Sequence, residues 1–380
     1  MSEAYITRIS IFLPNEAVPN DEMEQYLGYI NGKPSKSKAI VLRNNGIKSR
    51  YYALTKEGTA THTNAEMAAL AIKDLFANAP EELSEIDLLS CATSSPDQLM
   101  PSHGVMVHGW LPETDSIEVV SPSGVCCAGM HALKYAYMSV KIGEKKKAVS
   151  CASERLSPVL RAGQFEDEVQ QLIKLEQNPY LAFEKDFLRW MLSDGAGAFL
   201  IENKPNPEAI SLKIDWIEGC SFANEEEACM YMGSDKEADG VLKSYKDFSP
   251  EEVLDKSIFS IKQDVKLLGE KIVKLGFVKL QNIIAKRGLD MNEIDYFLPH
   301  LSSFFFERKI EDFFIENNIS VPKEKWFTNL ASKGNVGAAS IYMMLEEVFN
   351  SGKLKKGEKI LLVVPESARF SYMFCLLTVC

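Results

Sequence analysis

The sequence predicts an α/β fold built from two duplicated halves. Short apolar stretches suited to buried strands alternate with longer stretches of helical periodicity, as in α/β proteins with covered sheets. The tripeptide Glu-Ile-Asp at 85–87 also recurs 208 residues later, at 293–295. Cys127 and Asn335 each lie 42 residues after the start of one of these tripeptides. Two anchors at a single offset indicate an internal duplication that places a cysteine and an asparagine at matching points.

The same elements are expected in the same order in both halves. In the first half we predict strands at 5–13, 88–91 and 117–120 and an alanine-rich helix at 65–77. In the second we predict strands at 210–217, 296–298 and 326–328 and a long helix near 262–286. Apolar helices at 130–141 and 338–348 then lead through Gly- and Lys-rich turns into strands at 148–152 and 360–364. Cys127 and Asn335 should therefore both open buried helices.

A chain of 380 residues has the length of two such halves. We expect the first half to span 1–207 and the second 208–380. An interval at about 157–190 has no counterpart of similar length in the second half, and it predicts an inserted helical subdomain. The acidic interval 224–249 predicts a loop.

Composition excludes several classes of protein. A formal net charge of -11 argues against a general nucleic-acid partner, because phosphate binding requires concentrated Lys and Arg. Eight cysteines without a Cys-x-x-Cys pair predict buried thiols and no metal site. No apolar run approaches a membrane span, and the first residues lack the features of a signal peptide, so we expect a cytoplasmic protein.

Cys127 is the candidate nucleophile. A cysteine attacks as the thiolate, and the positive end of a helix dipole is expected to lower its pKa. The small residues Ala128 and Gly129 would let substrate and backbone approach closely. Cys126 precedes the helix, so we expect its side chain to point elsewhere and to be structural.

His300 is the candidate among five histidines. It follows a predicted strand at the strand's carboxyl end, where ligands of α/β sheets gather. The other four are expected to be structural: His62, His103, His108 and His131. The conjunction of His300 with Asn335 at a second helix start favours a shared site.

Five segments, in order, resemble the β-ketoacyl-acyl-carrier-protein synthase III enzymes of the thiolase superfamily. Residues 125–130 are similar to the family's Ala-Cys-Ala-Gly nucleophile motif, and 193–198 to its Gly-Asp-Gly-Ala-Gly-Ala turn. His300 is similar to its catalytic histidine, and 333–340 to its Gly-Asn-Thr-Ser-Ala-Ala-Ser segment. Residues 46–50 resemble its Gly-Ile-x-x-Arg element. The resemblance spans nearly the whole chain.

This resemblance implies a Cys127-His300-Asn335 triad. It also implies a five-layered α-β-α-β-α fold of two pseudo-symmetric halves, usually in a homodimer, and an acyltransferase without metal or redox cofactor. Cys127 would hold an acyl group from a coenzyme A or carrier-protein thioester. An enolate from a malonyl- or β-ketoacyl-thioester would then attack it, with His300 and Asn335 as donors to the thioester oxygen.

Two departures from the family pattern favour a specialised relative. The family's His-Gln-Ala-Asn is replaced by residues 300–303, His-Leu-Ser-Ser, and its last glycine-rich loop by residues 365–372. With its length and the run of three phenylalanines at 304–306, the chain resembles the ketosynthases of dialkylresorcinol and flexirubin-type pigment pathways. Six residues are candidates for contact with substrate: Arg43 for the phosphate or adenine of coenzyme A, and Phe304, Glu366, Arg369, Phe370 and Ser371 for the pocket. Four are candidates for docking an acidic carrier protein: Lys262, Lys266, Arg308 and Lys309.

Alternative functions remain open. A housekeeping fatty-acid initiation synthase and an enzyme that transfers the acyl group to an alcohol or amine retain the same nucleophile. A papain-like cysteine hydrolase shares the order Cys, His, Asn, but it would have a different cysteine motif and no internal duplication. A non-catalytic acyl-binding partner subunit would retain the fold without becoming acylated.

Overall fold

The computed structural model describes residues 2–35, 37–164, 188–319 and 321–380. Nine strands of this part form one mixed sheet in the order β13-β14-β15-β8-β1-β7-β6-β4-β5. These strands are β1 (Tyr5–Phe12), β4 (Leu88–Ala92), β5 (Glu118–Val120), β6 (Lys147–Glu154), β7 (Gly195–Glu202), β8 (Leu212–Ser221), β13 (Tyr296–Pro299), β14 (Lys359–Glu366) and β15 (Ser371–Val379). Short strands pair outside it: β2 (Val18–Pro19), β3 (Ser49–Arg50), β9 (Met230–Tyr231), β10 (Ser234–Lys236), β11 (Leu242–Ser244) and β12 (Lys262–Gln263).

The α-helices vary from single turns to the long α9. Their bounds are α1 (Met23–Leu27), α2 (Lys38–Asn45), α3 (Asn64–Asp74), α4 (His103–Gly109), α5 (Ala128–Lys141), α8 (Pro250–Asp255), α9 (Val265–Arg287), α10 (Phe305–Glu316), α11 (Leu330–Lys333) and α12 (Ser340–Phe349). The start of α3 has a capping box between Thr63 and Glu66, and Asp264 caps the start of α9 by accepting the Leu267 N–H.

The strands of the two halves follow the same order. From the edge inward, the first half runs β5-β4-β6-β7-β1 and the second runs β13-β14-β15-β8, so the first strand of each half lies innermost. The predicted strand at 326–328 would be the second-half counterpart of β5. It is reduced to one isolated parallel bridge between Trp326 and Phe297. The halves join where β1 meets β8 at two residue pairs, whereas β1 pairs with β7 along its whole length.

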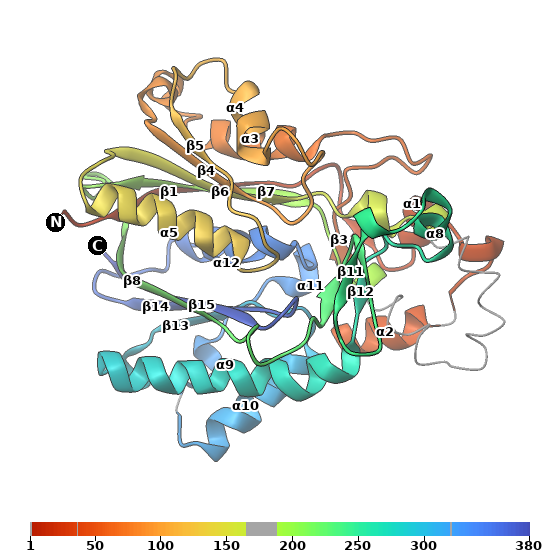
Figure 1. Ribbon diagram of the computed structural model, residues 1–380. Helices are drawn as coiled ribbons and strands as arrows, with labels where there is room; N and C mark the ends of the chain where they lie inside the picture. Colours follow the sequence, from red (N-terminus) through yellow and green to blue (C-terminus); the bar gives the residue numbers. More distant parts are fainter. Residues whose placement is uncertain (1, 36, 165–187, 320) are drawn as a thin grey trace.

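Five layers are visible in Figure 1. Helices α3 and α4 cover the outer face of the first-half strands, α5 and α12 lie between the strands of the two halves, and α9 and α10 cover the outer face of the second half. Three hydrophobic clusters fill the spaces: one around α5 and α12, one beneath α9 and α10, and one beneath α3 and α4. The expected α-β-α-β-α fold is therefore confirmed.

The central helices meet closely at their starts. A Cβ added at Gly129 would lie 2.4 Å from the carbonyl oxygen of Ala338, a distance at which backbone has to move. The Tyr342 hydroxyl of α12 also donates to the Gly129 carbonyl oxygen over 2.8 Å. Gly129 thus lets the two related helix starts touch, as the small-residue motif indicated, and brings the candidate residues of both halves together.

Two predicted segments differ from the structure or lie mostly outside its described residues. The interval 224–249, expected to be a loop, contains the short strands β9, β10 and β11, and β10 pairs with β11 as a small hairpin. The prediction of a loop is wrong for residues 234–236 and 242–244, which pair as strands on either side of the turn at Gly240. The predicted subdomain at 157–190 lies mostly outside the described residues, which include only 157–164 and 188–190 of it.

Candidate active site

Cys127 lies at the start of α5, where it occupies the N-cap position. Its backbone N–H donates to the Glu366 carboxylate at 2.9 Å, and so does the N–H of Val125. Its thiol donates to the Val364 carbonyl oxygen over 3.3 Å. Both partners of Cys127 come from β14, so the second half holds the candidate nucleophile of the first.

The pKa of the Cys127 thiol is raised well above its usual value. Burial is the main cause, and the nearby Glu366 carboxylate adds to it. The expectation that the helix dipole would lower this pKa is therefore wrong for the structure as it stands. A carboxylate occupies the amide groups that would otherwise stabilise a thiolate. Because burial is the larger cause, loss of the Glu366 charge alone would leave this pKa raised.

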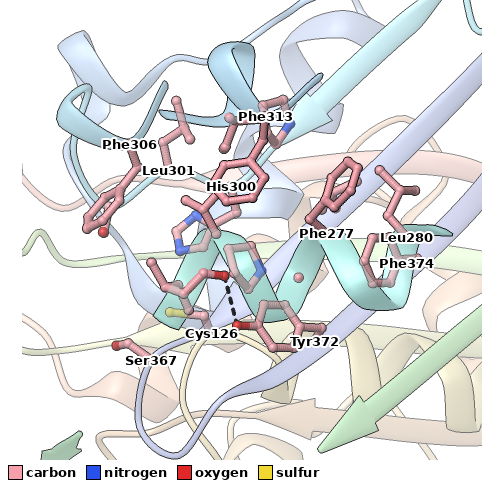
Figure 2. Close-up of a pocket in the computed structure, with 18 of the residues that line it drawn as sticks. Cys126, Phe277, Leu280, His300, Leu301, Phe306, Phe313, Ser367, Tyr372 and Phe374 are labelled. Atoms are coloured by element: carbon pink, nitrogen blue, oxygen red, sulfur yellow. Dashed lines mark hydrogen bonds between the residues drawn. The ribbon is translucent and has the colours of Figure 1, made fainter. Parts of the chain in front are cut away.

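The expectation that the Cys126 side chain points away from the site is wrong. It lines both apolar cavities described below, and it lies below His300 in Figure 2. Burial raises the pKa of its thiol, which keeps it protonated at neutral pH. Cys127, already in helical conformation at the start of α5, lines neither cavity. Both thiols thus belong to the site.

His300 follows the last residue of β13, at the carboxyl end of that strand. Its backbone N–H donates to the Val363 carbonyl oxygen over 2.8 Å, which extends the parallel pairing of β13 with β14. The side chain is 3% exposed, and its Nε2 has no hydrogen-bond partner among the described residues. Burial lowers the pKa of His300 to about 4, so its imidazole is neutral at pH 7. A neutral ring with an unpaired nitrogen can donate one hydrogen bond to a substrate oxygen.

The low pKa of His300 predicts a pH-dependent loss of stability. The unfolded chain binds a proton near the usual pKa of 6.5, whereas the folded chain resists protonation down to a pKa of about 4. The unfolded state therefore holds more protons between these values, and stability falls as the pH drops. We expect His300→Asn to reduce the loss between pH 7 and pH 5 by about 2 kcal/mol. Urea unfolding of both proteins at the two pH values measures this, and equal losses would contradict the buried neutral imidazole.

Asn335 presents its amide nitrogen to the second cavity. Its Oδ1 accepts the Gly337 N–H at 3.0 Å and also faces the Ser340 hydroxyl, which fixes the orientation of the amide. The residue is 4% exposed and lines that cavity. The helix expected to begin here starts with a 3-10 turn, Gly337–Ala339, before α12. The side-chain NH₂ group thus remains available as a donor.

Two apolar cavities meet at Cys126, the chain neighbour of the candidate nucleophile. The first, of about 810 Å³ with its open mouth, lies between α9, α10 and the carboxyl ends of β13 and β14, and it reaches His300. Figure 2 shows Phe277, Leu280 and Phe374 at the end away from Cys126. The second, of about 780 Å³ measured the same way, reaches Asn335. Both cavities share four lining residues: Cys126, Leu268, Ser302 and Ser367.

Comparisons with known proteins agree with this geometry. A family model described as 3-oxoacyl-[acyl-carrier-protein (ACP)] synthase III C terminal matches residues 284–366, which include His300, Asn335 and Glu366. A β-ketoacyl-[acyl-carrier-protein] synthase III of Clostridium perfringens is 25% identical over 366 residues, covering 96% of this chain and 95% of its own. Over nearly its whole length, the chain is therefore similar to the synthase III acyltransferases.

Solved structures share the fold of this synthase III-like chain. AbyA1, a tetronic acid condensing enzyme, superposes with a TM-score of 0.77 at 17% identity, covering 99% of both chains. OleA of Xanthomonas campestris, solved with lauric acid and lauroyl-CoA, superposes with a TM-score of 0.72 at 18% identity, also covering 99% of both chains. The similarity to the synthase III enzymes supports a condensing enzyme of the Claisen type.

Most of the other candidate pocket residues of this synthase III-like enzyme lie outside both cavities. Arg43 is exposed on α2, and Phe304 packs against Gly46. The Arg369 side chain turns away and donates to the Glu226 carbonyl oxygen at 2.9 Å. Phe370, with a φ of 58°, ends the turn between β14 and β15, and Ser371 is the first residue of β15. Four of these residues line neither cavity, contrary to the prediction: Phe304, Arg369, Phe370 and Ser371. The prediction that Arg43 contacts the phosphate or adenine of coenzyme A stays a prediction.

The cavity walls come instead from residues that the sequence did not single out. The run at 304–306 contributes only its last member, Phe306, to the first cavity. Ile310, Phe313 and Phe314 follow along the same face of α10. An apolar spacing of three and four residues was present in the sequence, and it could have indicated this wall. Nothing in the sequence indicated that the wall encloses a cavity rather than a core.

The four candidate docking cations are not equivalent. Lys262 lies in β12 rather than on a helix and pairs with Asp235 at 3.1 Å. Lys309 of α10 donates to the Gly269 carbonyl oxygen at 3.0 Å. Neither Lys266 nor Arg308 has an ion-pair partner in the part of the chain that the structure describes. Of the four, these two are the cations available to an acidic partner.

Asp194 organises the wall of the second cavity. It is fully buried and accepts the backbone N–H groups of Ala53, Leu156 and Ser157 at 2.6–2.9 Å. Leu156 lines the cavity. The Asp-Gly-Ala-Gly-Ala turn, matched in the sequence as a family motif, therefore has a specific role here: it ties two chain segments together behind the site.

Neither a membrane-spanning helix nor a metal-binding cluster is found in the described ranges. No helix there combines the length and apolar character needed to cross a bilayer. No three of the His, Cys, Asp and Glu side chains in those ranges are arranged to hold a metal ion.

Proposed function

We propose that this enzyme joins two acyl chains by a Claisen condensation in specialised lipid or polyketide synthesis of the dialkylresorcinol type. The observation that carries the proposal is the pair of apolar cavities that meet at Cys126, next to Cys127, one reaching His300 and the other Asn335. An initiation synthase that joins a short starter to malonyl needs room for one acyl chain. Two cavities reached from one centre suit two chains, one on the enzyme and one on the incoming thioester.

Cys127 takes the first acyl group. Its thiol gives up the Val364 carbonyl contact, attacks the donor thioester and releases the donor thiol. The backbone N–H of Cys127 then faces the carbonyl oxygen of the acyl-enzyme. The His300 Nε2 and the Asn335 amide nitrogen donate hydrogen bonds to the thioester oxygen of the second substrate. Neither nitrogen has a hydrogen-bond partner among the described residues. The proposed mechanism uses no metal or redox cofactor.

The partners follow from this chemistry. The acyl donors are coenzyme A or carrier-protein thioesters, and Lys266 and Arg308 offer charge for an acidic carrier protein. OleA, whose structure includes lauroyl-CoA, is a structural neighbour that binds one such donor. A homodimer would cover the unpaired edge of β5 and the exposed apolar residues Leu99 and Met100.

The experiment that tests the function follows both half-reactions. The protein is incubated with acyl-CoA donors of several lengths, and intact mass spectrometry detects the acyl-enzyme. A β-ketoacyl thioester is then added, and the released product is identified. A product that contains both chains supports the proposal. Release of the free acid, or transfer to an added alcohol or amine, would instead support a hydrolase or another acyltransferase, and no adduct at all would support a non-catalytic partner subunit.

Asn335→Ala is expected to separate the two half-reactions. Loss of the amide removes one donor to the enolate oxygen, which should lower the condensation rate by about 10²- to 10³-fold. Self-acylation should change little, because the carbonyl of the acyl-enzyme uses a backbone N–H. Rates of adduct formation and product release from one sample measure both effects. Equal loss of both half-reactions would assign Asn335 a purely structural role.

A further inference from the structure

Glu366 is the last residue of β14 and stands where the family has a glycine-rich loop. Its carboxylate is buried, and Oε2 accepts the N–H groups of both Val125 and Cys127 at 2.9 Å. The other oxygen, Oε1, has no hydrogen-bond partner among the described residues. No Lys or Arg of the described ranges forms an ion pair with it. Within the described ranges, its hydrogen bonds come from the two backbone N–H groups at and just before the N-cap of α5.

The groups that face this carboxylate are those of the candidate site. Cys126, Cys127 and His131 are all close enough for its charge to act on their protonation. Its chain neighbours Pro365 and Ser367 line the first cavity, and Ser367 also lines the second. Glu366 is therefore hydrogen-bonded to Cys127, the residue proposed to carry the acyl group, and lies beside the junction of the two cavities.

Both carboxylate oxygens of Glu154, the other buried acid near Cys126, are already engaged in hydrogen bonds. It accepts five hydrogen bonds, from Thr93, Ser94 twice, Ser95 and the Ala338 N–H. These bonds tie both of its oxygens to the strand ends of the first half and to the start of α12. Glu366, with one uncommitted oxygen, is the carboxylate that can accept a proton.

The proposed reaction needs such a group. A malonyl thioester forms its enolate by losing carbon dioxide, whereas a β-ketoacyl thioester has no carboxylate to lose. Its α-carbon must give up a proton instead. His300 and Asn335 can stabilise the resulting enolate, but His300 is committed as a hydrogen-bond donor. A base close to the acyl-enzyme is still required.

We propose that Glu366 is the general base that removes the α-proton of the second thioester, an inference that rests on the proposed function. Acylation places the acyl carbonyl oxygen on the Cys127 N–H and displaces Oε2 from it, while the Val125 N–H retains the carboxylate. The α-carbon has to approach the acyl carbonyl carbon on Cys127 to about 3–3.5 Å, which brings its proton beside Glu366.

The step balances without a further reactant. Glu366 takes the α-proton, and the electron pair of the C–H bond becomes the enolate. The enolate carbon bonds to the acyl carbonyl carbon, the carbon–sulfur bond to Cys127 breaks, and the thiolate leaves. The proton on Glu366 passes to that thiolate. The enzyme returns to the thiol and carboxylate forms, and the product carries the new carbon–carbon bond.

The test compares Glu366→Gln with wild type in three measurements. These are self-acylation by acyl-CoA, condensation with a β-ketoacyl thioester, and exchange of the α-proton of that thioester with D₂O above the enzyme-free rate. We expect condensation and enzyme-dependent exchange to fall at least about 100-fold, with self-acylation within about threefold of wild type. Glu316→Gln, an exposed change at the end of α10, is the matched control and should leave all three unchanged.

Failure of the inference is distinguishable from failure of the proposed function. If wild type is acylated but gives no product with any β-ketoacyl thioester, the proposed function is wrong. If wild type condenses and Glu366→Gln condenses and exchanges as well as wild type, Glu366 is not the base. Should Glu366→Gln fold poorly, Glu366→Ala with added acetate decides: a small carboxylate restores condensation if Glu366 is a base, and absence of rescue in the folded, acylated variant overturns the proposal.

Discussion

Cys127→Ala is expected to abolish acyl-enzyme formation. The acyl group needs a covalent acceptor, and Cys127 is the thiol at the start of α5 whose own N–H can bind the acyl carbonyl oxygen. Loss of a catalytic nucleophile costs a factor of at least about 10³ in rate. Incubation with acyl-CoA and intact mass spectrometry should therefore detect no adduct, and condensation should fall below detection.

Cys126→Ala is the matched control, one residue away and equally apolar. It should retain acylation, although Cys126 lines both cavities and its loss enlarges their junction. Peptide mapping of wild type locates the adduct directly. An acyl group on Cys126 would reverse the assignment and would mean that the thiol facing the cavities, rather than the one in the family motif, is the nucleophile. Because the two thiols are chain neighbours at one cavity junction, this is the sharpest comparison that the chain offers.

The family, the layered fold and the positions of Cys127, His300 and Asn335 on their elements could be predicted from sequence. Hydrophobic periodicity located the strands and helices, because burial on one or both faces imposes its period on the residues. The repeat at one offset then placed α5 and α12 at equivalent points. Ends of elements were less accurate: Asn335 precedes a 3-10 turn, and the strand at 326–328 is a single bridge.

Side-chain environments could not be predicted in the same way. The pKa of Cys127 depends on Glu366, 239 residues further along the chain, and no periodicity reports such a contact. Arg369 was a reasonable pocket candidate by its position near Glu366, yet one left-handed residue at Phe370 turns the chain and carries Arg369 to the surface. The local sequence pattern predicts helices and strands, whereas these side-chain contacts depend on how helices and strands distant in the sequence pack together.

The two candidate donors also show what the duplication does and does not fix. Asn335 corresponds to Cys127 under the 208-residue offset, and both occupy the start of a central helix. His300 corresponds to Ala92, the last residue of β4, which has no polar side chain to offer. The shared fold supplies two equivalent helix starts, and divergence between the halves decides which chemistry each provides.

Asp194→Ala is expected to destabilise the protein by about 3–5 kcal/mol. The carboxylate accepts three backbone N–H groups and the Ser157 hydroxyl in a fully buried position. Alanine leaves all of these donors unpaired, and each unpaired buried group costs about 1–3 kcal/mol before the structure relaxes. The urea midpoint, followed by far-UV circular dichroism, should fall accordingly.

Two further variants show whether the loss arises from the unpaired amides. Asp194→Asn keeps one acceptor oxygen but turns an NH₂ group toward a donor, so its loss should lie between wild type and Asp194→Ala. Asp115→Ala, an exposed change, should stay within about 0.5 kcal/mol. Because Leu156 lines the second cavity, Asp194→Asn should also slow condensation more than self-acylation. A stable, fully active Asp194→Ala protein would mean that the Asp-Gly-Ala-Gly-Ala turn holds its shape without the carboxylate.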